Sequence, residues 1–177
     1  LPKTQCNGFW LTYDNFFLGR RLRHGVPFRK LFLLRNGSGA FQRVDENYWT
    51  TLDMEVHEQL EIKGEVGTIR SPIIHNNYKG LSHFLTKHNE YSTWEARRFL
   101  SGEEVPNPSF RQKVKRVLID SYLLGPVYFL VNYIFRLGFL DGFSGLLYSI
   151  FKSIYFLEVK LKIDELRKSN VAATSSV

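Results

Sequence analysis

Residues 117–135, VLIDSYLLGPVYFLVNYIF, contain a single charged side chain, Asp120, and this stretch decides how the C-terminal half folds. A second apolar stretch, residues 143–157, is interrupted only by Lys152. A membrane-spanning helix needs about 20 apolar residues, so the first stretch is of borderline length and the second is too short. We expect both to be helical, with a kink at Gly125-Pro126 because proline cannot donate a helical hydrogen bond.

Basic residues flank these two apolar stretches. Residues 110–116 precede the first, and the second is followed by Lys160, Lys162, Arg167 and Lys168. Aromatic-rich faces between basic flanks favour helices that lie in the membrane interface or re-enter it. A spanning helix and a soluble helical hairpin packed on the main domain are the alternatives. We therefore assign residues 106–168 to a membrane-associated helical region and residues 169–177 to a disordered tail.

The first 75 residues have the character of strands and loops. Residues 8–13 and 31–34 are short apolar runs bounded by Gly, Asp and Asn, and residues 36–39, NGSG, predict a turn. Gly64 separates two further runs, which indicates a hairpin or a bulge there. Residues 72–74, PII, predict the start of a buried strand.

A helix is predicted over residues 77–101. Its apolar side chains fall on one face, and they are Leu81, Phe84, Leu85, His88 and Tyr91. Gly102 is a suitable stop, and the two prolines that follow mark a boundary between residues 105 and 106. The strands and this helix together predict an α/β fold class, in the form of an α+β fragment.

The composition indicates the classes of molecule that this chain could bind, but it does not decide among them. The net charge is +7 and the isoelectric point is near 9.5, so nucleic acid, anionic lipid and phosphorylated substrates are all compatible. Cys6 is the only cysteine, which rules out an internal disulfide and points to a reducing compartment or to a protein that does not rely on disulfides. Because the sequence starts with Leu1 and enters a structured run by Gly8, we expect it to begin within a longer protein.

The densest group of polar residues is DMEVHE, residues 53–58. In an extended strand Asp53, Glu55 and His57 face one way and Glu58 faces the other. A carboxylate beside an imidazole can act as a general base or hold a divalent cation. A solvated charged strand is the alternative.

Two further features carry potential chemistry. His75 follows the predicted strand at residues 72–74 and is positioned to reach a site, although a histidine there is also compatible with a capping role. His83 and His88 are five apart, which does not fit a helical metal pair. A basic cluster suits phosphate capture or forms a solvated loop, and it comprises Arg20, Arg21, Arg23, His24, Arg29 and Lys30.

Three stretches, taken in order, resemble family 2 glycosyltransferases. Residues 8–25, GFWLTYDNFFLGRRLRHG, resemble the segment after the nucleotide-binding core. Residues 52–96, from LDMEVHEQL to YSTWEA, resemble the acceptor-side segment. Residues 135–162, FRLGFLDGFSGLLYSIFKSIYFLEVKLK, resemble the C-terminal tail of members that build bacterial lipopolysaccharide core or exopolysaccharide. The resemblance covers roughly residues 8–168 and is strongest to the group that adds glucose to the heptose of the inner core.

The resemblance implies a GT-A fold and sugar transfer with inversion from a nucleotide-sugar donor to a saccharide or lipid-linked acceptor. It implies Glu58 as the base, with His57 beside it and Glu55 and Asp53 as the alternatives. His75 corresponds to the histidine that helps to ligate a Mg²⁺ or Mn²⁺ holding the donor diphosphate. The arginines at positions 20, 21 and 23 lie near acceptor or diphosphate. The implied location is the cytoplasmic face of the bacterial inner membrane.

The family's Asp-x-Asp metal motif occurs nowhere in the 177 residues. We therefore assign residues 1–105 to the acceptor-side part of a catalytic domain whose donor-binding half is missing, and expect this chain alone to be inactive. A noncatalytic, membrane-associated interaction protein is the second hypothesis. A nucleic-acid-binding module is the third, and we expect no nucleic-acid partner because the aromatics gather in apolar runs and no recognised motif appears.

Overall fold

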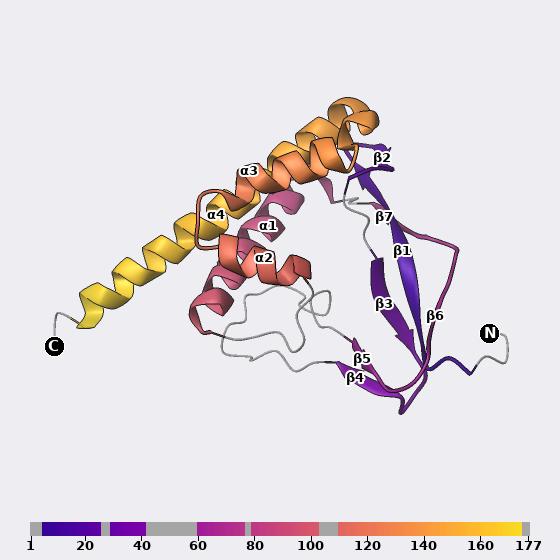
Figure 1. Cartoon of the computed structure of the whole chain (residues 1–177). Coiled ribbons are helices and arrows are strands. Elements are labelled where there is room, and N and C mark those ends of the chain that lie inside the picture. Colours follow the sequence, from indigo (N-terminus) through magenta and orange to yellow (C-terminus); the bar gives the residue numbers. More distant parts are fainter. Residues whose placement is uncertain (1–4, 26–28, 42–59, 77–78, 103–109, 175–177) are drawn as a thin grey trace.

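The computed structural model describes residues 5–25, 29–41, 60–76, 79–102 and 110–174. It is a mixed α and β structure, as the sequence predicted, with strands in the first part of the chain and helices in the second. A sheet lies at one side of the molecule and a helical layer at the other (Figure 1).

Strand β1 (Gly8–Phe17) is the centre of the sheet. It pairs antiparallel with β2 (Arg20–Leu22) and with β3 (Arg29–Leu34). It also pairs in parallel with β6 (Val66–Thr68) and β7 (Ile73–Asn76). Strands from two distant parts of the chain therefore meet on β1.

A second, small sheet corrects one prediction. Strand β4 (Gly39–Phe41) follows the predicted turn and pairs antiparallel with β5 (Leu60–Ile62). The two runs around Gly64 thus belong to different sheets, because β6 joins β1 instead of β5. The hairpin predicted there is wrong.

The predicted buried strand after Pro72 is β7, but it is not buried. Ile74 is 67% exposed. Its described partner strand is β1, and the side chain of Ile74 is left open to solvent.

Helix α1 (Gly80–Leu100) confirms the helix predicted over residues 77–101, but not the whole of its predicted face. Leu81 and Leu85 are exposed, whereas Ser92, Trp94 and Ala96 are buried. The buried residues thus lie in the second half of α1, beyond the predicted apolar face. His88 lies among the rings of Phe84, Tyr91, Phe151 and Tyr155, and has the structural role expected of it.

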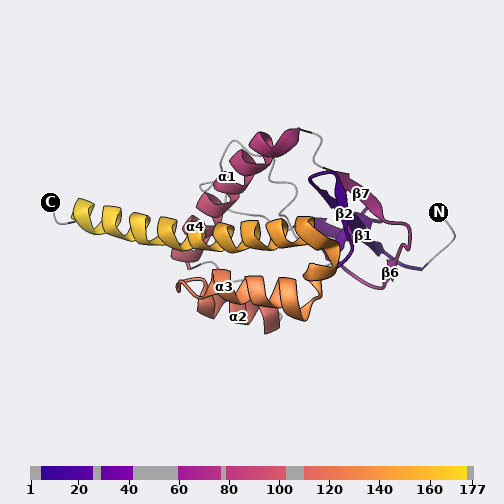
Figure 2. The ribbon, with the colours of Figure 1, turned by 90° about the horizontal axis from the view of Figure 1, so that it is seen from above.

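The C-terminal half is a set of helices around one long helix. Helix α2 (Phe110–Leu118) is followed by α3 (Leu124–Phe129), a π-helical segment η3 (Leu130–Phe135) and a short 3₁₀ segment η4 (Gly138–Asp141). Helix α4 (Gly142–Thr174) completes the chain. It runs between α1 and α3 (Figure 2). The predicted disordered tail is therefore helical from 169 to 174, because each added residue extends the ladder of helical hydrogen bonds.

The predicted kink at Gly125-Pro126 is absent. The chain breaks earlier, between α2 and α3, and Pro126 lies in the first turn of α3. An N–H in the first turn has no partner within the helix, so proline costs little there. Gly125 instead permits close packing, because a Cβ on it would lie 2.7 Å from the backbone oxygen of Ser153 in α4.

A single core joins α1 to the helices that follow it. It contains Ala96 of α1, Ile119 and Leu124 of the α2–α3 region, and Tyr155, Phe156, Val159 and Ile163 of α4. It thus crosses the boundary predicted between residues 105 and 106.

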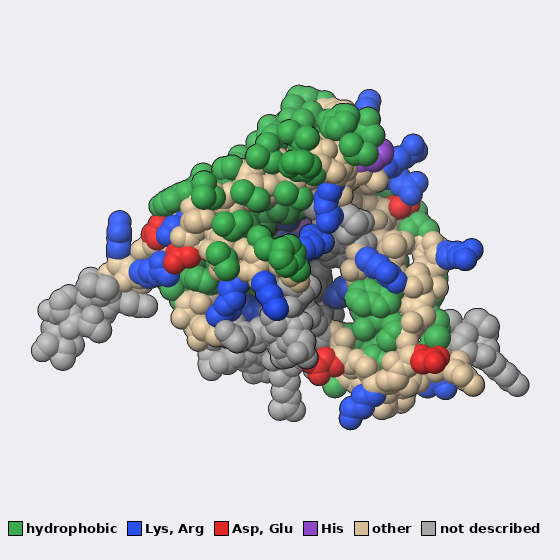
Figure 3. Space-filling model, viewed as in Figure 1, with side chains coloured by type: hydrophobic (Ala, Val, Ile, Leu, Met, Phe, Trp, Pro, Cys, Tyr) green, Lys and Arg blue, Asp and Glu red, His purple; other side chains and the backbone are tan. Residues whose placement is uncertain are grey.

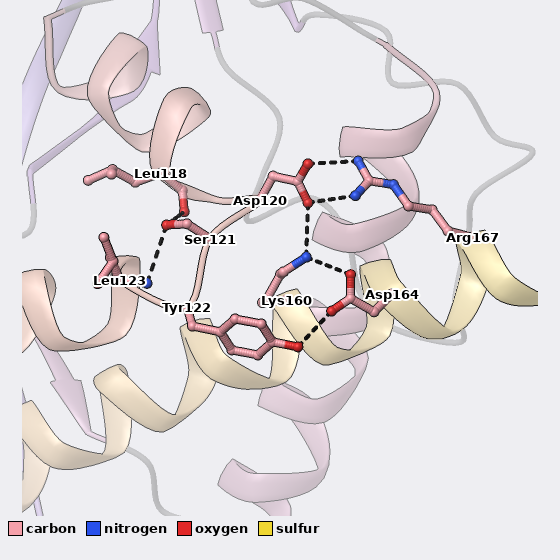
Figure 4. A network of polar contacts seen from close by, with 8 residues as sticks. All are labelled: Leu118, Asp120, Ser121, Tyr122, Leu123, Lys160, Asp164 and Arg167. Atoms are coloured by element: carbon pink, nitrogen blue, oxygen red, sulfur yellow. Dashed lines mark hydrogen bonds and ion pairs between the residues drawn. The ribbon is translucent and has the colours of Figure 1, made fainter.

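Polar contacts also fix α4. Lys162 Nζ lies 2.6–2.8 Å from four oxygen atoms of α1, contributed by Asn89, Ser92 and Thr93. On the other side, Arg167 binds Asp120 through both carboxylate oxygens at 2.7 and 2.8 Å (Figure 4). Lys160 reaches Asp120 at 3.2 Å and Asp164 at 2.5 Å.

Candidate functional site

The predicted base and its alternatives, Asp53, Glu55, His57 and Glu58, lie outside the described residues. The candidate site is therefore built from the residues on β1, β2 and β7. Its described part lies where the second half of β1 meets β7 on one edge and β2 on the other.

His75 faces the neighbouring strand β1. Its Nδ1 lies 3.0 Å from Oδ1 of Asn15, directly opposite in the parallel pairing, and its ring packs edge-on against Tyr13 at 5.7 Å. Since Oδ1 can only accept, Nδ1 carries the proton and Nε2 keeps a lone pair. Desolvation first, and the positive charge of Lys87 second, lower the pKa of His75 below 6.5. A neutral imidazole with a free Nε2 can accept a proton or ligate a metal.

Further metal ligands do not gather around His75 among the described residues. Within the ranges given above, no three His, Cys, Asp or Glu side chains come together in a cluster suited to a metal ion. His75 could therefore supply one metal ligand, and any further ligands would have to lie outside the described residues.

The six basic residues predicted as one cluster separate into two groups. Arg29 lies opposite Thr12 of β1, bonded to Thr68 at 2.7 Å and 5.0 Å from the centre of the Trp10 ring. Arg20, Arg21 and Arg23 lie at the C-terminal end of β1. Arg21 is neutralised there by Asp14 at 2.6 Å, whereas Arg20 and Arg23 expose their side chains to solvent.

Asp141 links this end of the sheet to the helices, a role that the sequence did not reveal. Its carboxylate accepts hydrogen bonds from the backbone N–H groups of Arg23 at 3.0 Å and His24 at 2.9 Å, and lies 3.1 Å from His24 Nδ1. The side chain is only 5% exposed. Burial alone would raise the pKa of Asp141, but these donors outweigh it and lower the pKa. The only local signal is a lone aspartate between Leu140 and Gly142.

A second contact supports the same junction. Gly25 N–H donates to the carbonyl of Arg136 at 2.9 Å, and Asn132 Nδ2 donates to Ser149 Oγ at 2.7 Å. A Cβ on Gly25 would lie 2.8 Å from Asn132 Oδ1. The chain that follows β2 is thus held against η3 and η4 by the Gly25–Arg136 bond and the Asp141 carboxylate, and the Asn132 side chain leaves little space for a Cβ at Gly25.

Hydrophobic side chains cover the outer side of the helical region (Figure 3). On the α3 arm the exposed residues are Leu123, Val127, Leu130, Val131, Ile134 and Phe135. On α4 they are Phe143, Ile150, Ile154, Leu157 and Leu161. Both sets recur every three or four residues or at multiples of that spacing, so each forms a stripe along one helix face.

Among the described residues, no single helix is long and apolar enough to cross a membrane. One bent pair, residues 124–135 with residues 138–169, meets the length and composition criteria jointly, and it changes direction by 75° at the break.

Comparison with known proteins adds no relative. No protein-family model, curated protein or solved structure matches the chain.

Proposed function

We propose that this chain supplies the acceptor-side part of a family 2, inverting glycosyltransferase of GT-A fold, working at the cytoplasmic face of a bacterial inner membrane. It would transfer a sugar from a nucleotide-sugar donor to a lipopolysaccharide-core or polysaccharide acceptor. The observation that supports this is the meeting of the three resembling stretches. Asn15 of the first contacts His75 of the second, and the backbone at Arg23 and His24 of the first binds Asp141 of the third.

In this proposal Glu58 removes the proton from the acceptor hydroxyl as the hydroxyl oxygen attacks the anomeric carbon of the donor. His57, Glu55 and Asp53 precede it closely in sequence. His75 offers Nε2 to a Mg²⁺ or Mn²⁺, which would supply neutralisation of the leaving diphosphate. Arg20 and Arg23 keep exposed guanidinium groups that suit phosphate oxygens.

The test is a sugar-transfer assay on the chain joined to the sequence encoded directly upstream of it, comparing Glu58→Gln with the unchanged protein. Loss of the base should lower the rate by about 10²–10⁴-fold. Glu61→Gln is the matched control, since Glu61 is an exposed carboxylate on β5. Full activity of Glu58→Gln would remove Glu58 from the role of base.

A noncatalytic, membrane-associated interaction protein is the second candidate, and the two exposed apolar stripes favour it. It needs no carboxylate–histidine site. The absence of sugar transfer by the joined protein, across a panel of nucleotide sugars with Mg²⁺ or Mn²⁺, would favour this candidate over the first.

A further inference from the structure

The bend between η3 and α4 exposes unusually large apolar side chains. Phe135 is 77% exposed, Phe143 is 71% exposed and Leu140 is 55% exposed. Phe135 ends η3, Leu140 lies within η4, and Phe143 lies in the first turn of α4. Such a concentration at one end of the molecule marks an interaction site, because isolated exposed apolar residues are normal but contiguous ones are not.

The β1–β2 hairpin adds cations beside this apolar bend. Leu18, 55% exposed, stands at the hairpin turn, and Arg20 and Arg23 follow with exposed side chains. Figure 3 shows Lys and Arg side chains next to the hydrophobic ones at this end of the molecule. The bend and the hairpin together are called the tip surface below.

The parts of the tip surface are fixed relative to each other. Asp141 lies between the exposed Leu140 and Phe143 in sequence and binds the backbone of Arg23 and His24. Gly25 binds the carbonyl of Arg136. The arginines and the apolar bend therefore present one preformed surface.

We propose that the tip surface docks on a membrane containing anionic lipid, with the bend inserted among the acyl chains and Arg20 and Arg23 at the lipid phosphates. The apolar stripes on α3 and α4 continue from the bend, so the bent pair lies along the membrane without crossing it. The inference rests on the membrane-surface part of the proposed function and is independent of sugar transfer.

Charge decides between a lipid surface and a second copy of the chain. The chain carries a net charge of +7, and in a symmetric dimer each tip surface would place its arginines close to like charges. Anionic headgroups satisfy the apolar and the cationic parts at once.

Vesicle flotation of the whole chain tests the proposal. The protein should float with phosphatidylglycerol-containing vesicles and bind pure phosphatidylcholine vesicles far more weakly. Each arginine near an anionic surface contributes about fivefold in partitioning, so Arg20→Gln with Arg23→Gln should lower binding to anionic vesicles by roughly thirtyfold. Arg97→Gln with Arg35→Gln is the control, because both are exposed arginines outside the tip surface.

A second set of variants tests the apolar part of the tip surface. Phe143→Asp with Leu140→Asp should reduce binding by at least about a hundredfold, while the equally charged pair Phe32→Asp with Leu33→Asp, two exposed residues of β3, should not. In a further variant, Phe143→Trp, the fluorescence of the added tryptophan should be quenched by brominated lipid acyl chains, after the fluorescence of the wild-type tryptophans is subtracted. The fluorescence added by Phe32→Trp should not be quenched.

Three outcomes would overturn the proposal. One is equal flotation with the two vesicle types. Another is unchanged flotation of both tip variants. The third is a stable oligomer, by ultracentrifugation, that the Phe143→Asp with Leu140→Asp protein loses while still binding vesicles. None of these measurements contains a sugar donor, so their failure is distinct from a failure of sugar transfer.

Discussion

The ammonium group of Lys152 is buried between helices that offer it little compensation. It lies 5.0 Å from the centre of the Tyr155 ring, and burial lowers the pKa of Lys152 to about 8. Lys115 on α2 lowers the pKa further, and Glu95 on α1 acts in the opposite direction. At neutral pH, keeping Lys152 protonated therefore destabilises the folded state relative to the unfolded state.

Replacing this lysine by methionine should stabilise the fold at neutral pH. Lys152→Met keeps the length of the side chain and removes the buried charge, so the free energy of unfolding should rise by up to about 3 kcal/mol, since one unit of pKa corresponds to about 1.4 kcal/mol. The unfolded state binds more protons between about pH 8 and pH 10.5, so wild-type stability rises with pH through that window. The gain from the substitution should shrink accordingly.

Urea unfolding at neutral pH and near pH 10 measures this difference. Lys113→Met on the exposed part of α2 is the control and should change stability little at either pH. A destabilised Lys152→Met protein at neutral pH would mean that the contact with Tyr155 outweighs the cost of burial.

Substituting Gly25 and Gly37 by alanine allows the cost of backbone strain to be compared with the cost of steric crowding. Both have a positive φ, +80° and +79°, but only Gly25 has a neighbour, Asn132, where a Cβ would go. Gly37→Ala should cost about 1–2 kcal/mol, the usual cost of an L-residue in the left-handed region. Gly25→Ala should cost about 1–3 kcal/mol more, because the side chain must also displace Asn132.

Thermal or urea unfolding of the two variants gives the comparison directly. Equal costs would show that the junction between β2 and η3 yields readily. Loss of stability in Gly25→Ala should be accompanied by loss of its contact with Arg136, visible as faster amide hydrogen exchange at residue 25.

At the scale of elements, local sequence patterns predicted the α1 helix and the turn, but they did not predict which strands pair with which. The turn at Asn36 to Gly39 and the helix over α1 followed from local signals, because the residues that form them are neighbours in sequence. The pairing of β6 and β7 with β1 did not follow, since it joins segments some 60 residues apart and Gly64 marks only a local change of direction.

The candidate site shows the same limit. His75 was predicted as a site residue from its place at a strand, but no sequence motif marked Asn15, which contacts His75, or Asp141, which binds the backbone after β2. The arginine cluster was predicted as one group because the residues are close in sequence. Arg20 on β2 lies opposite Phe17, whereas Arg29 on β3 lies opposite Thr12, so the pairing places them along different parts of β1.

The contact of α4 with the α2–α3 connection should depend on pH through Asp120. The bond from Arg167, opposed by burial and helped by Lys160, lowers the pKa of Asp120 below 3.8. A carboxylate with a lowered pKa stabilises the fold above its unfolded pKa, and the contribution is lost as pH falls through the folded pKa.

A double-mutant cycle of Asp120→Ala and Arg167→Ala should give a coupling energy of about 0.5–1 kcal/mol at neutral pH, the upper range for an exposed pair with two-point geometry. The coupling should fall at 1 M salt and weaken as the pH drops below 3.8, as the Asp120 carboxylate becomes protonated. Coupling that is unchanged in acid would show that the pair is not held by the ionised carboxylate.

At the scale of the whole molecule, the helices share one core, and we expect them to unfold as a single cooperative unit. Ile163→Ala should lower the free energy of unfolding by about 2–5 kcal/mol, because its side chain is fully buried where α1 and α4 meet. Ile154→Ala, on the same helix but 48% exposed, should cost much less.

The same pair of variants tests cooperativity across residues 105 and 106. With Trp10 and Trp49 replaced by Phe, the fluorescence of Trp94 reports on α1, while circular dichroism reports mostly on the longer helices. The two transitions should coincide and move together in Ile163→Ala. Separate transitions would divide the chain at the boundary predicted from its prolines.

Strand β1 also constrains how the length of this chain can change. Its ten residues pair with four other strands, and a shift of one residue turns every following side chain to the opposite face. A residue inserted into or deleted from β1 would therefore disturb several strand pairings at once, whereas the turn at Leu18 and Gly19 could accommodate an added residue more easily. Insertions and deletions that survive in descendants of this gene should accumulate in the turns and be rare between Gly8 and Phe17.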